Sequence, residues 1–390
     1  MYSILTLNKI ATCGLAQLPE DKFQVSDDVE MPHAILLRSA DMHSYEVPES
    51  LLAVGRAGAG VNNIPVDKYA EQGVVVFNTP GANANAVKEL IVAGILLSSR
   101  KIHAGINWVQ SLQGQSGVAK LVEKEKGKFV GPEITGKKIG VLGLGAIGVL
   151  VANACNSLGM DVYGYDPFLS VDAAWALSRG VHKAASIDEI LSVCDYVSIN
   201  VPLNADTKNM INAEKLSIAK KGARLLNFSR ADLVDNAAIK DAVQSGQISC
   251  YVTDFPNEDL LGIDGIITIP HLGASTPESE DNCAVMAAQE INDYLLYGSI
   301  KNSVNYPDCN LLSVSGRKRF CVFHKNIPKV VARLADVFAG RGVNIDNMIN
   351  RSKGTNAYTV LEVDDVDDAD LPGAEDDLRA VNGVVRVRVI

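Results

Sequence analysis

Basic residues and long apolar runs are both scarce in this sequence. Lysine and arginine number 36 against 46 acidic residues, which gives a formal net charge of -10 at pH 7. No basic stretch is interleaved with aromatic residues, so the charge pattern argues against nucleic-acid binding. The longest uncharged apolar run, residues 90–97, is far shorter than the ~20 residues that a membrane-spanning helix needs. We therefore expect neither nucleic acid nor a membrane as a partner.

Cysteines with the spacing of a metal site or a disulfide framework are also absent. The seven cysteines lie singly along the chain, none in a C-x-x-C pair, and Cys250 and Cys321 stand in apolar stretches. This distribution favours buried, reduced thiols over disulfides or a zinc site. Residues 1–7 have no basic segment ahead of an apolar one and are interpreted as a strand, not a targeting segment. We expect a cytoplasmic protein without a bound metal.

What the sequence does contain is an alternation of short apolar runs with helical patterns. At 390 residues, with 47% hydrophobic and 21% charged residues, the chain is long enough for two or three globular domains. Helical patterns separate most of the runs, which predicts parallel sheets, an α/β fold class and two doubly wound, Rossmann-like domains. The predicted strands are residues 34–37, 51–54, 74–77, 138–142, 161–165, 196–201, 224–228, 249–253 and 266–269.

The C-terminal residues, 318–390, follow a different pattern. An apolar strand, a helix, two strands, a short helix and a final strand succeed one another there. This β-α-β-β-α-β order is that of a ferredoxin-like α+β domain. We predict a small additional domain at this end of the chain.

A glycine-rich segment, G-L-G-A-I-G at 143–148, follows a predicted strand and opens a predicted helix. Gly143, Gly145 and Gly148 permit a tight turn, close approach of a pyrophosphate and close packing of the helix on the sheet. The helix start then offers free N–H groups and the positive end of its dipole to the phosphates. Asp166 ends the next strand, where a carboxylate accepts hydrogen bonds from the adenosine ribose and repels a 2′-phosphate. The pattern predicts NAD rather than NADP; the alternative is a glycine-rich turn that only packs against the sheet.

Polar residues end three successive predicted strands farther along the chain, namely Arg230, Asp254 and His271. Because ligands of a doubly wound sheet bind at the carboxyl ends of its strands, these residues should converge near the nicotinamide. Hydride transfer from an alcohol needs a base for the hydroxyl proton and a cation for the carboxylate and the forming carbonyl. We interpret His271 as the acid/base, with Glu258 as the carboxylate that raises its affinity for the proton. Arg230 is the expected substrate clamp, and Asp254 the expected contact at the nicotinamide end.

Each of these residues has a simpler interpretation when it is taken singly. Arg230 could form an ion pair at the surface, and His271 could cap the helix that follows it. Their joint placement at the ends of successive strands favours the catalytic interpretation, because ligands of a doubly wound sheet bind at those ends.

Six short segments carry a resemblance to a known family over essentially the whole chain. They are G-R-A-G-A-G-V-N-N at 55–63, N-T-P at 78–80, G-L-G-A-I-G at 143–148, Y-D-P at 165–167, N-F-S-R at 227–230 and P-H-L-G-A-S-T at 270–276. Together they resemble the D-2-hydroxyacid dehydrogenases, most closely those members that oxidise 3-phospho-D-glycerate. The resemblance implies that Arg230, Glu258 and His271 are the catalytic set.

The resemblance also implies further binding residues. With the residues argued above, the predicted cofactor set becomes Thr79, Gly143, Gly145, Ala146, Ile147, Gly148, Asp166, Val201, Phe228, Ser229, Arg230, Asp254, His271, Gly273 and Ala274. The predicted substrate set is Arg38, Ser39, Arg56 and Asn83. Lys126 or Lys128 is a further candidate for contact with a substrate phosphate.

A discontinuous domain arrangement follows from the same resemblance. Residues 1–95 and 284–310 would form the substrate-binding domain, and residues 96–283 would form the NAD-binding domain inserted between them. Residues 318–390 look like an ACT domain, a small-molecule sensor of amino-acid biosynthetic enzymes. The residues expected to bind an effector such as L-serine are His324, Asn326 and Asn344.

The expected reaction is NAD-dependent oxidation of 3-phospho-D-glycerate to 3-phosphohydroxypyruvate, the first step of serine biosynthesis. Another D-2-hydroxyacid dehydrogenase activity, such as that of a hydroxypyruvate or glyoxylate reductase, is the main alternative. A non-catalytic NAD-sensing protein is the second. A long helix predicted over residues 86–112 is apolar on one side, so a homodimer or homotetramer is expected.

The sequence departs from the family pattern at two informative places. Lys329 follows Pro328 where relatives usually have glycine, and the larger side chain bears on whether serine inhibits. The spacing from Asp254 to the glutamate is one residue shorter than usual, and Asp259 stands where proline normally follows. Asp259 is therefore an alternative to Glu258.

Overall fold

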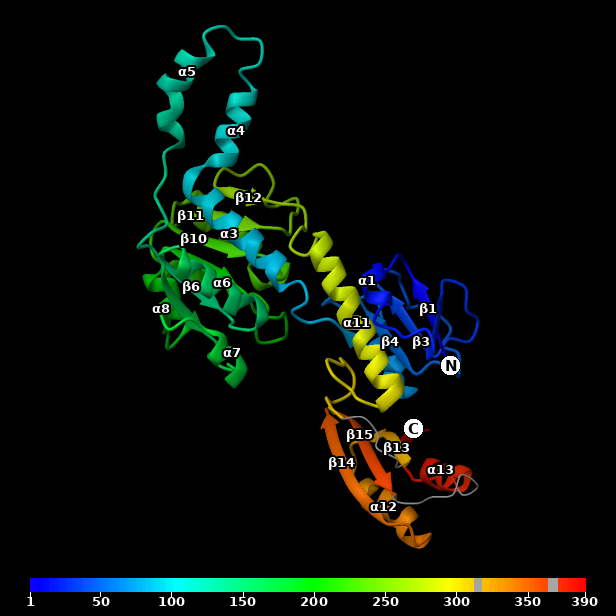
Figure 1. The fold of residues 1–390 in the computed structure, drawn as a ribbon. Coiled ribbons are helices and arrows are strands. Elements are labelled where there is room, and N and C mark those ends of the chain that lie inside the picture. Colours follow the sequence, from blue (N-terminus) through cyan, green and yellow to red (C-terminus); the bar gives the residue numbers. More distant parts are fainter. Residues whose placement is uncertain (312–317, 364–370) are drawn as a thin grey trace. The chain divides into compact units, whose positions relative to one another are not determined.

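The computed structural model describes residues 1–311, 318–363 and 371–390, and Figure 1 shows its fold. The chain divides into two compact units, one made of Met1–Ala82 with Glu280–Ile390 and the other of Asn83–Ser279. The second unit is continuous in sequence, and the first is interrupted by it. Among the residues described, no helix is long and apolar enough to cross a membrane.

The continuous unit is built on a seven-stranded parallel sheet. Its strands are β6 (Lys138–Leu142), β7 (Asp161–Tyr165), β8 (Val181–Lys183), β9 (Tyr196–Ile199), β10 (Ala223–Asn227), β11 (Ile248–Thr253) and β12 (Ile266–Thr268). Their order is β12-β11-β10-β9-β6-β7-β8, so the chain winds outward in both directions from β6 and β9. Ligands of doubly wound sheets bind beside such a reversal of strand order.

Helices cover both faces of this sheet. They are α3 (Ala84–Arg100), α6 (Ala146–Ser157), α7 (Val171–Ala176), α8 (Ile187–Val193), α9 (Ala213–Ser217) and α10 (Asn236–Gln244), with a 3-10 turn η2 (Ala231–Leu233). Ile139 and Val141 of β6 join the core beneath α3 and α6, whereas Leu142 joins the core beneath α8 and α10. Alternate residues of one strand are thus buried on opposite faces, as apolar strands of parallel sheets usually are.

The long helix predicted over residues 86–112 is two helices. Lys101, in the left-handed conformation with φ 46°, separates α3 from α4 (Ile102–Gln110). A second helix, α5 (Val118–Glu125), and a 3-10 turn, η1 (Lys126–Phe129), then form a hairpin with α4 (Figure 1). No glycine or proline marks the break, and lysine rarely adopts this conformation, so the break could not be predicted from the sequence.

The interrupted unit begins with a five-stranded parallel sheet. Its strands are β1 (Tyr2–Leu7), β2 (Phe23–Ser26), β3 (Ala34–Leu37), β4 (Ala53–Arg56) and β5 (Val75–Asn78), in the order β2-β1-β3-β4-β5. Its helices are α1 (Thr12–Leu15), α2 (Val66–Glu71) and the returning α11 (Pro277–Tyr297). Ala287 and Ile291 of α11 pack with Phe77 of β5 in the core of one face. Tyr69 of α2 fills the core of the other face.

A four-stranded antiparallel sheet completes this unit. Its strands are β13 (Lys318–Lys325), β14 (Ile345–Lys353), β15 (Asn356–Val363) and β16 (Val384–Val389), and its helices are α12 (Val330–Gly340) and α13 (Leu371–Arg379). The order β14-β15-β13-β16 is the ferredoxin-like arrangement predicted from the sequence. The predicted fold class, two doubly wound parallel sheets plus a small α+β sheet, is thereby confirmed.

Both faces of the antiparallel sheet are buried. Phe320 and Val322 of β13 pack against α12 and α13, whereas Cys321 and Phe323 join the core that surrounds α11. Tyr358 Oη donates a hydrogen bond of 2.8 Å to a carbonyl just past the end of α11. The antiparallel sheet therefore shares a core with the five-stranded sheet, although the sequence predicted a domain of its own over residues 318–390.

The other predicted boundaries also differ from the compact units. A boundary between residues 95 and 96 would cut α3, which lies whole in the continuous unit. Most predicted strands lie within one to three residues of the observed ones, and β3, β6 and β7 coincide with their predictions. The strands β2 and β8 were missed because they are short and carry few apolar residues.

Candidate active site

The carboxyl edge of the seven-stranded sheet collects the predicted cofactor and catalytic residues. The turn after β6 begins at Gly143, and Asp166 follows β7. Arg230, Asp254 and His271 follow β10, β11 and β12, which are neighbours in the sheet. Because all seven strands are parallel, every one of these residues lies at the same edge.

The glycine-rich turn has the geometry that a dinucleotide requires. Gly143 has a φ of 85°, and a Cβ there would lie 2.5 Å from the carbonyl oxygen of Asn200. At Gly148 a Cβ would lie 1.9 Å from the Gly143 carbonyl oxygen, so α6 could not approach the turn so closely. At Gly145 a Cβ would meet nothing within 4 Å, which leaves open space at the N-terminus of α6. Among the described residues no side chain caps this helix start, so its N–H groups fit a bound pyrophosphate.

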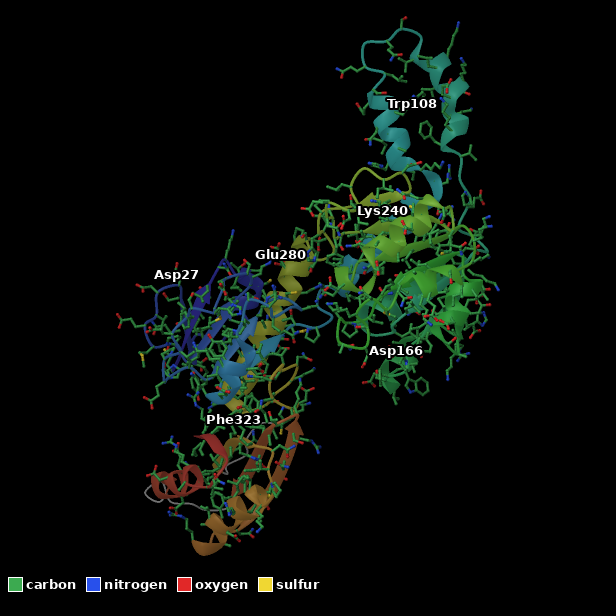
Figure 2. All side chains as sticks on the ribbon, turned by 180° about the vertical axis from the view of Figure 1, so that it is seen from behind. Asp27, Trp108, Asp166, Lys240, Glu280 and Phe323 are labelled. Atoms are coloured by element: carbon green, nitrogen blue, oxygen red, sulfur yellow. The ribbon has the colours of Figure 1, made fainter. Side chains whose placement is uncertain are left out.

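Asp166 closes the same turn from the next strand. Its Oδ2 accepts the Leu144 backbone N–H at 2.8 Å, and its Oδ1 accepts the Phe168 N–H at 2.8 Å. These two bonds fix the carboxylate beside the glycine-rich turn. A cavity of about 450 Å³ opens next to Asp166, and Figure 2 labels this residue on the continuous unit. The position suits a carboxylate that receives ribose hydroxyls.

The remaining predicted cofactor residues occupy loops and helix starts. In the continuous unit these are Ala146 and Ile147 in the first turn of α6, Val201 after β9, Phe228 and Ser229 after β10, and Gly273 and Ala274 after β12. Thr79 belongs to the interrupted unit, where it follows β5 and is fully buried.

A buried asparagine organises the turn that presents Arg230. Asn227 Oδ1 accepts the Ser229 N–H at 3.2 Å, and its Nδ2 donates to the Arg230 carbonyl at 2.9 Å. Ser229 Oγ donates to the Ile199 carbonyl on β9 at 2.8 Å, which ties the turn to the neighbouring strand. The Arg230 guanidinium is exposed and donates to the Ser229 carbonyl at 2.6 Å. The turn is rigid, and the cation stands at its surface.

Asp254 is the buried acid of this edge. Burial raises the pKa of its carboxyl, while the nearby His271 and the Gly273 N–H oppose the increase. Its Oδ2 accepts the Gly273 N–H at 3.2 Å, which tethers the loop that carries His271. Its Oδ1 has no hydrogen-bond partner within the described residues. Asp254 is therefore bonded to the loop that begins at His271, and its second oxygen remains available as an acceptor.

The predicted pair of His271 and Glu258 is close in sequence position but is not joined by a hydrogen bond within the described residues. The exposed His271 ring lies against Phe255, with ring centroids 5.1 Å apart. Glu258 is exposed in a turn whose start, Asn257, accepts the Asp259 N–H at 3.1 Å. Both Glu258 and Asp259 lie in this turn, so the backbone alone does not show which of them is the carboxylate partner of His271.

The carboxyl edge of the five-stranded sheet carries the predicted substrate residues of the interrupted unit. Asn8, with a left-handed φ of 101°, accepts the backbone N–H groups of Arg38 and Ser39 at 3.2 and 3.0 Å. The Arg38 guanidinium pairs with Glu280 of α11 at 2.7 Å. Figure 2 labels Glu280 on this unit. Arg38 is thus held by an acid that sequence reasoning did not single out.

Arg56 is engaged more extensively than Arg38. Its Nε donates to the Arg38 carbonyl at 3.0 Å, and its Nη1 donates to the Gly60 carbonyl. A Cβ at Gly58 would lie 2.8 Å from that Nη1, so the glycine-rich loop folds closely around the guanidinium. Arg56 therefore holds two loops of the substrate edge together. The fourth predicted residue, Asn83, belongs to the continuous unit and precedes α3.

The predicted effector residues are spread over the antiparallel sheet. His324 is buried, and its ring nitrogens contact Thr359 Oγ1 and the Lys325 carbonyl, each at 2.8 Å. Asn326 Nδ2 donates to the Gly354 carbonyl at 3.2 Å, and Asn344 is exposed. The two lysines predicted near a substrate phosphate, Lys126 and Lys128, pair with Glu123 and Glu125 beside the α4–α5 hairpin.

Lys329 has an unusual backbone conformation for a lysine. It precedes α12 with a φ of 73°, in the left-handed region that glycine adopts without strain. The sequence identified this position, but it gave no signal for the roles of Asn8, Asn227 and Glu280. Their contributions depend on partners far away in sequence.

Comparison with known proteins agrees with this geometry. Residues 92–273 match the family model described as "D-isomer specific 2-hydroxyacid dehydrogenase, NAD binding domain". The chain is 30% identical to the D-3-phosphoglycerate dehydrogenase of Escherichia coli (strain K12) over 391 residues, which covers 95% of this chain and 90% of that relative. It is 31% identical to the D-3-phosphoglycerate dehydrogenase of Methanocaldococcus jannaschii over 324 residues, which covers 81% of this chain and 60% of that relative.

Solved structures show the same fold at lower identity. D-mandelate dehydrogenase of Rhodotorula graminis superposes with a TM-score of 0.67 at 22% identity, covering 80% of this chain and 99% of that one. The NAD-bound 3-phosphoglycerate dehydrogenase of Entamoeba histolytica superposes with a TM-score of 0.58 at 22% identity, covering 78% and 98%. The chain belongs to the D-isomer-specific 2-hydroxyacid dehydrogenase family. It is an NAD-dependent dehydrogenase.

Proposed function

We propose that this enzyme oxidises 3-phospho-D-glycerate to 3-phosphohydroxypyruvate with NAD, the first step of serine biosynthesis. The observation that carries the proposal is the placement of Arg230, Asp254 and His271 at the ends of three adjacent strands, on the edge that bears the dinucleotide turn. The substrate is inferred from the relatives named D-3-phosphoglycerate dehydrogenase. One of these, the E. coli protein, aligns over 95% of this chain.

The proposed roles follow from charge and exposure. The exposed Arg230 guanidinium holds the substrate carboxylate and the oxygen on C2, where negative charge develops as the carbonyl forms. An imidazole nitrogen of His271 takes the proton of the C2 hydroxyl, and Glu258 favours the protonated ring. NAD, when bound, supplies the acceptor for the hydride. Arg38 and Arg56 bind the anionic groups of the substrate.

Buried Asp254 has the role of a positioning residue for this chemistry. Its bond to the Gly273 N–H fixes the loop that starts at His271, so the imidazole is held at the sheet edge. Since its other oxygen lacks a partner among the described residues, Asp254 also offers an acceptor at the nicotinamide end. Removing this carboxylate should increase the mobility of the loop that starts at His271 and leave the overall fold intact.

The test is the formation of NADH from NAD and 3-phospho-D-glycerate, with the product trapped to draw the reaction forward. We expect turnover by the native chain and loss of most of it in His271→Ala, roughly 10²- to 10⁴-fold, with NAD binding retained. Separate Glu258→Gln and Asp259→Asn variants identify which acid assists His271. Turnover of glyoxylate or hydroxypyruvate with NADH, and none of 3-phospho-D-glycerate, would move the proposal to another hydroxy acid.

We also propose that the antiparallel sheet is an ACT domain that binds an amino-acid effector such as L-serine. Its β-α-β-β-α-β order along the chain and its strand order β16-β13-β15-β14 support this assignment. Lys329 occupies a left-handed position of the backbone and carries a long side chain, three residues after the proposed effector residue Asn326 and five after His324. Assays with and without L-serine, in the native chain and in Lys329→Gly, test whether the effector acts and whether this side chain opposes it.

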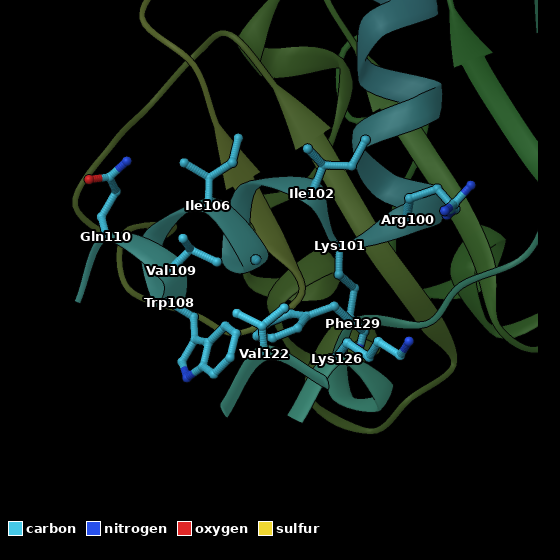
Figure 3. A pocket seen from close by; sticks show the side chains of 11 residues that line it. Arg100, Lys101, Ile102, Ile106, Trp108, Val109, Gln110, Val122, Lys126 and Phe129 are labelled. Atoms are coloured by element: carbon cyan, nitrogen blue, oxygen red, sulfur yellow. The ribbon is translucent and has the colours of Figure 1, made fainter. Parts of the chain in front are cut away.

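The oligomer we propose is a homodimer or homotetramer assembled through the α4–α5 hairpin. No residue of either helix is buried in the single chain, and Ile102, Ile106 and Val109 of α4 are large apolar side chains in contact with solvent. Figure 3 shows these residues around a hollow of about 410 Å³, with Trp108 and Phe129 close together at 5.4 Å between centroids. An apolar hairpin of this kind is stable in water when a second copy covers it.

Sedimentation velocity tests the oligomer. The native chain should sediment as a dimer or larger, and Ile106→Asp should lower the association constant because it places a charge in the apolar contact. Lys120→Asp, on the same hairpin but in an exposed, polar position, is the matched control. A native chain that sediments as a monomer at all concentrations contradicts the proposal.

A further inference from the structure

A second polar cavity lies in the interrupted unit. Its volume is about 560 Å³, within the range of small-molecule sites. One wall is the β14–β15 hairpin, which contributes Arg351, Ser352 and Lys353. The other wall consists of the segment after α11 with Asn302 and Asp308, together with Asn78 at the end of β5 and Pro80 after it. All of these segments belong to one compact unit.

The charges of this cavity favour an anion. Arg351 and Lys353 line it against a single acid, Asp308. The Lys353 ammonium donates to the Ser303 carbonyl at 2.7 Å, which holds the hairpin against the segment after α11. Within the described residues the Arg351 guanidinium has no ion pair or hydrogen bond. A planar guanidinium in such a position binds carboxylates and phosphates through two parallel hydrogen bonds.

Hydrogen bonds and a β-bridge fix the residues that form the walls of the cavity. Ser303 pairs with Phe77 of β5 in an isolated antiparallel bridge, and the Asn78 N–H lies 3.5 Å from the Asn302 carbonyl. Asn302 is held in the left-handed conformation, with φ 59°, by a 2.7 Å hydrogen bond from its Nδ2 to the buried Glu290. These contacts keep the polar wall in place opposite Arg351.

We infer that this cavity, which is lined entirely by residues of the interrupted unit, is a binding site for a small carboxylate or phosphate anion. Arg351 is its principal anchor, and Lys353 adds positive charge beside it. The negative charge of Asp308 repels the anion and therefore weakens its binding. The hydroxyl of Ser352 and the amides of Asn78 and Asn302 provide the neutral polar lining.

Isothermal titration of the full chain with inorganic phosphate and, separately, with succinate tests the site and distinguishes the two sources of anion. We expect Arg351→Gln to weaken binding of the preferred probe about tenfold, the loss of one charge-assisted hydrogen-bond pair. Asp308→Asn should strengthen it several-fold, because it removes the opposing charge. Arg333→Gln, an exposed arginine on α12, is the matched control and should bind as the native chain does.

Opposite effects of the Arg351 and Asp308 variants are the signature of an anion in this cavity. Both residues are exposed, and circular dichroism and thermal melting of each variant will establish that the fold is kept. Native affinity in both variants, or no saturable binding of either probe, overturns the proposal. Binding that is lost in Arg230→Gln and kept in Arg351→Gln also overturns it, since the anion would then be held at the catalytic edge.

Discussion

The two parallel sheets both present arginines at their carboxyl edges, but the arginines are in different states. Arg230 of the seven-stranded sheet is exposed, and its guanidinium bonds only to the carbonyl of its own turn among the described residues. Arg38 and Arg56 of the five-stranded sheet are engaged by Glu280 and by backbone carbonyls. The first edge presents a cation that is ready for a ligand. The arginines of the second edge hold its own loops together, so an anion that binds them would have to displace these internal partners.

Replacing one arginine at each edge should separate these two states most clearly. Arg230→Gln should lower kcat/KM by roughly 10²- to 10³-fold, because it removes charge stabilisation where the carbonyl forms. It should leave the unfolding free energy nearly unchanged, because the side chain is exposed. Arg56→Gln should instead cost about 1–3 kcal/mol of unfolding free energy, because it leaves partly buried carbonyls unpaired.

Steady-state kinetics and denaturant unfolding of both variants are the measurements for this comparison. Arg100→Gln, an exposed arginine at the end of α3, is the control for loss of a positive charge. Equal loss of unfolding free energy in the two variants would contradict the proposed difference between Arg230 and Arg56.

The pH dependence of stability should show the next largest effect, through Glu290 of α11. Burial raises the pKa of this carboxyl to about 8, although the hydrogen bond from Asn302 lowers it. The folded state holds the proton of Glu290 more tightly than the unfolded state does. The contribution of this group to the unfolding free energy is therefore largest below pH ~4.5. This contribution decreases as the pH rises toward 8, by up to about 1.4 kcal/mol per pH unit.

Glu290→Gln should remove most of this slope and stabilise the chain at pH 8. Unfolding by denaturant at several pH values measures the effect. Glu278→Gln, an exposed acid in the first turn of the same helix, should leave the slope as it is. A native chain whose stability rises between pH 5 and 8, after the contribution of other groups is subtracted with the Gln variant, would contradict the burial argument.

A smaller effect is expected from the Arg38–Glu280 pair. Both side chains are about half exposed, so the ion pair contributes only ~0–1 kcal/mol. Glu280→Gln releases Arg38 and should lower the KM for an anionic substrate by up to about fivefold, with kcat little changed. Initial-rate measurements at low ionic strength are the most sensitive, because salt screens exposed charges. A raised KM would show that Glu280 orients Arg38 for the substrate instead of competing with it.

The smallest expected effect is on the backbone before α12. Lys329→Gly should stabilise the chain by about 0.5–1 kcal/mol, because glycine adopts the left-handed conformation without steric cost. Arg333→Gly, inside α12, should destabilise it by about the same amount. Thermal unfolding of the pair gives opposite shifts if the conformation at Lys329 is the cause.

The placement of the candidate site residues at one edge of the sheet could be predicted because strand ends can be identified locally. An apolar run followed by glycine, aspartate or histidine gives both the strand and its last polar residue, as at Gly143, Asp166 and His271. The partners of the second edge could not be predicted in this way. Asn8 and Glu280 act on Arg38 across 30 and 242 positions of sequence, and no local pattern links them.

The shared core of the interrupted unit could have been suspected from β13. The run F-C-V-F at 320–323 is apolar at every position, so it needs cover on both faces of its sheet. The sequence pattern was interpreted as a separate domain because the helices α12 and α13 account for one face. The other face is covered by packing against the core around α11, which is a property of the tertiary structure.

That shared core also sets the order in which the chain can fold as it is synthesised. The continuous unit, Asn83–Ser279, has all of its strands as soon as its own residues have left the ribosome. The first five strands, in contrast, wait for α11 and for Phe323 and Tyr358 before their core is complete. During that interval their apolar face is uncovered, which is the condition under which nascent chains aggregate or recruit chaperones. Residues far downstream in the sequence thus complete the core of the first five strands.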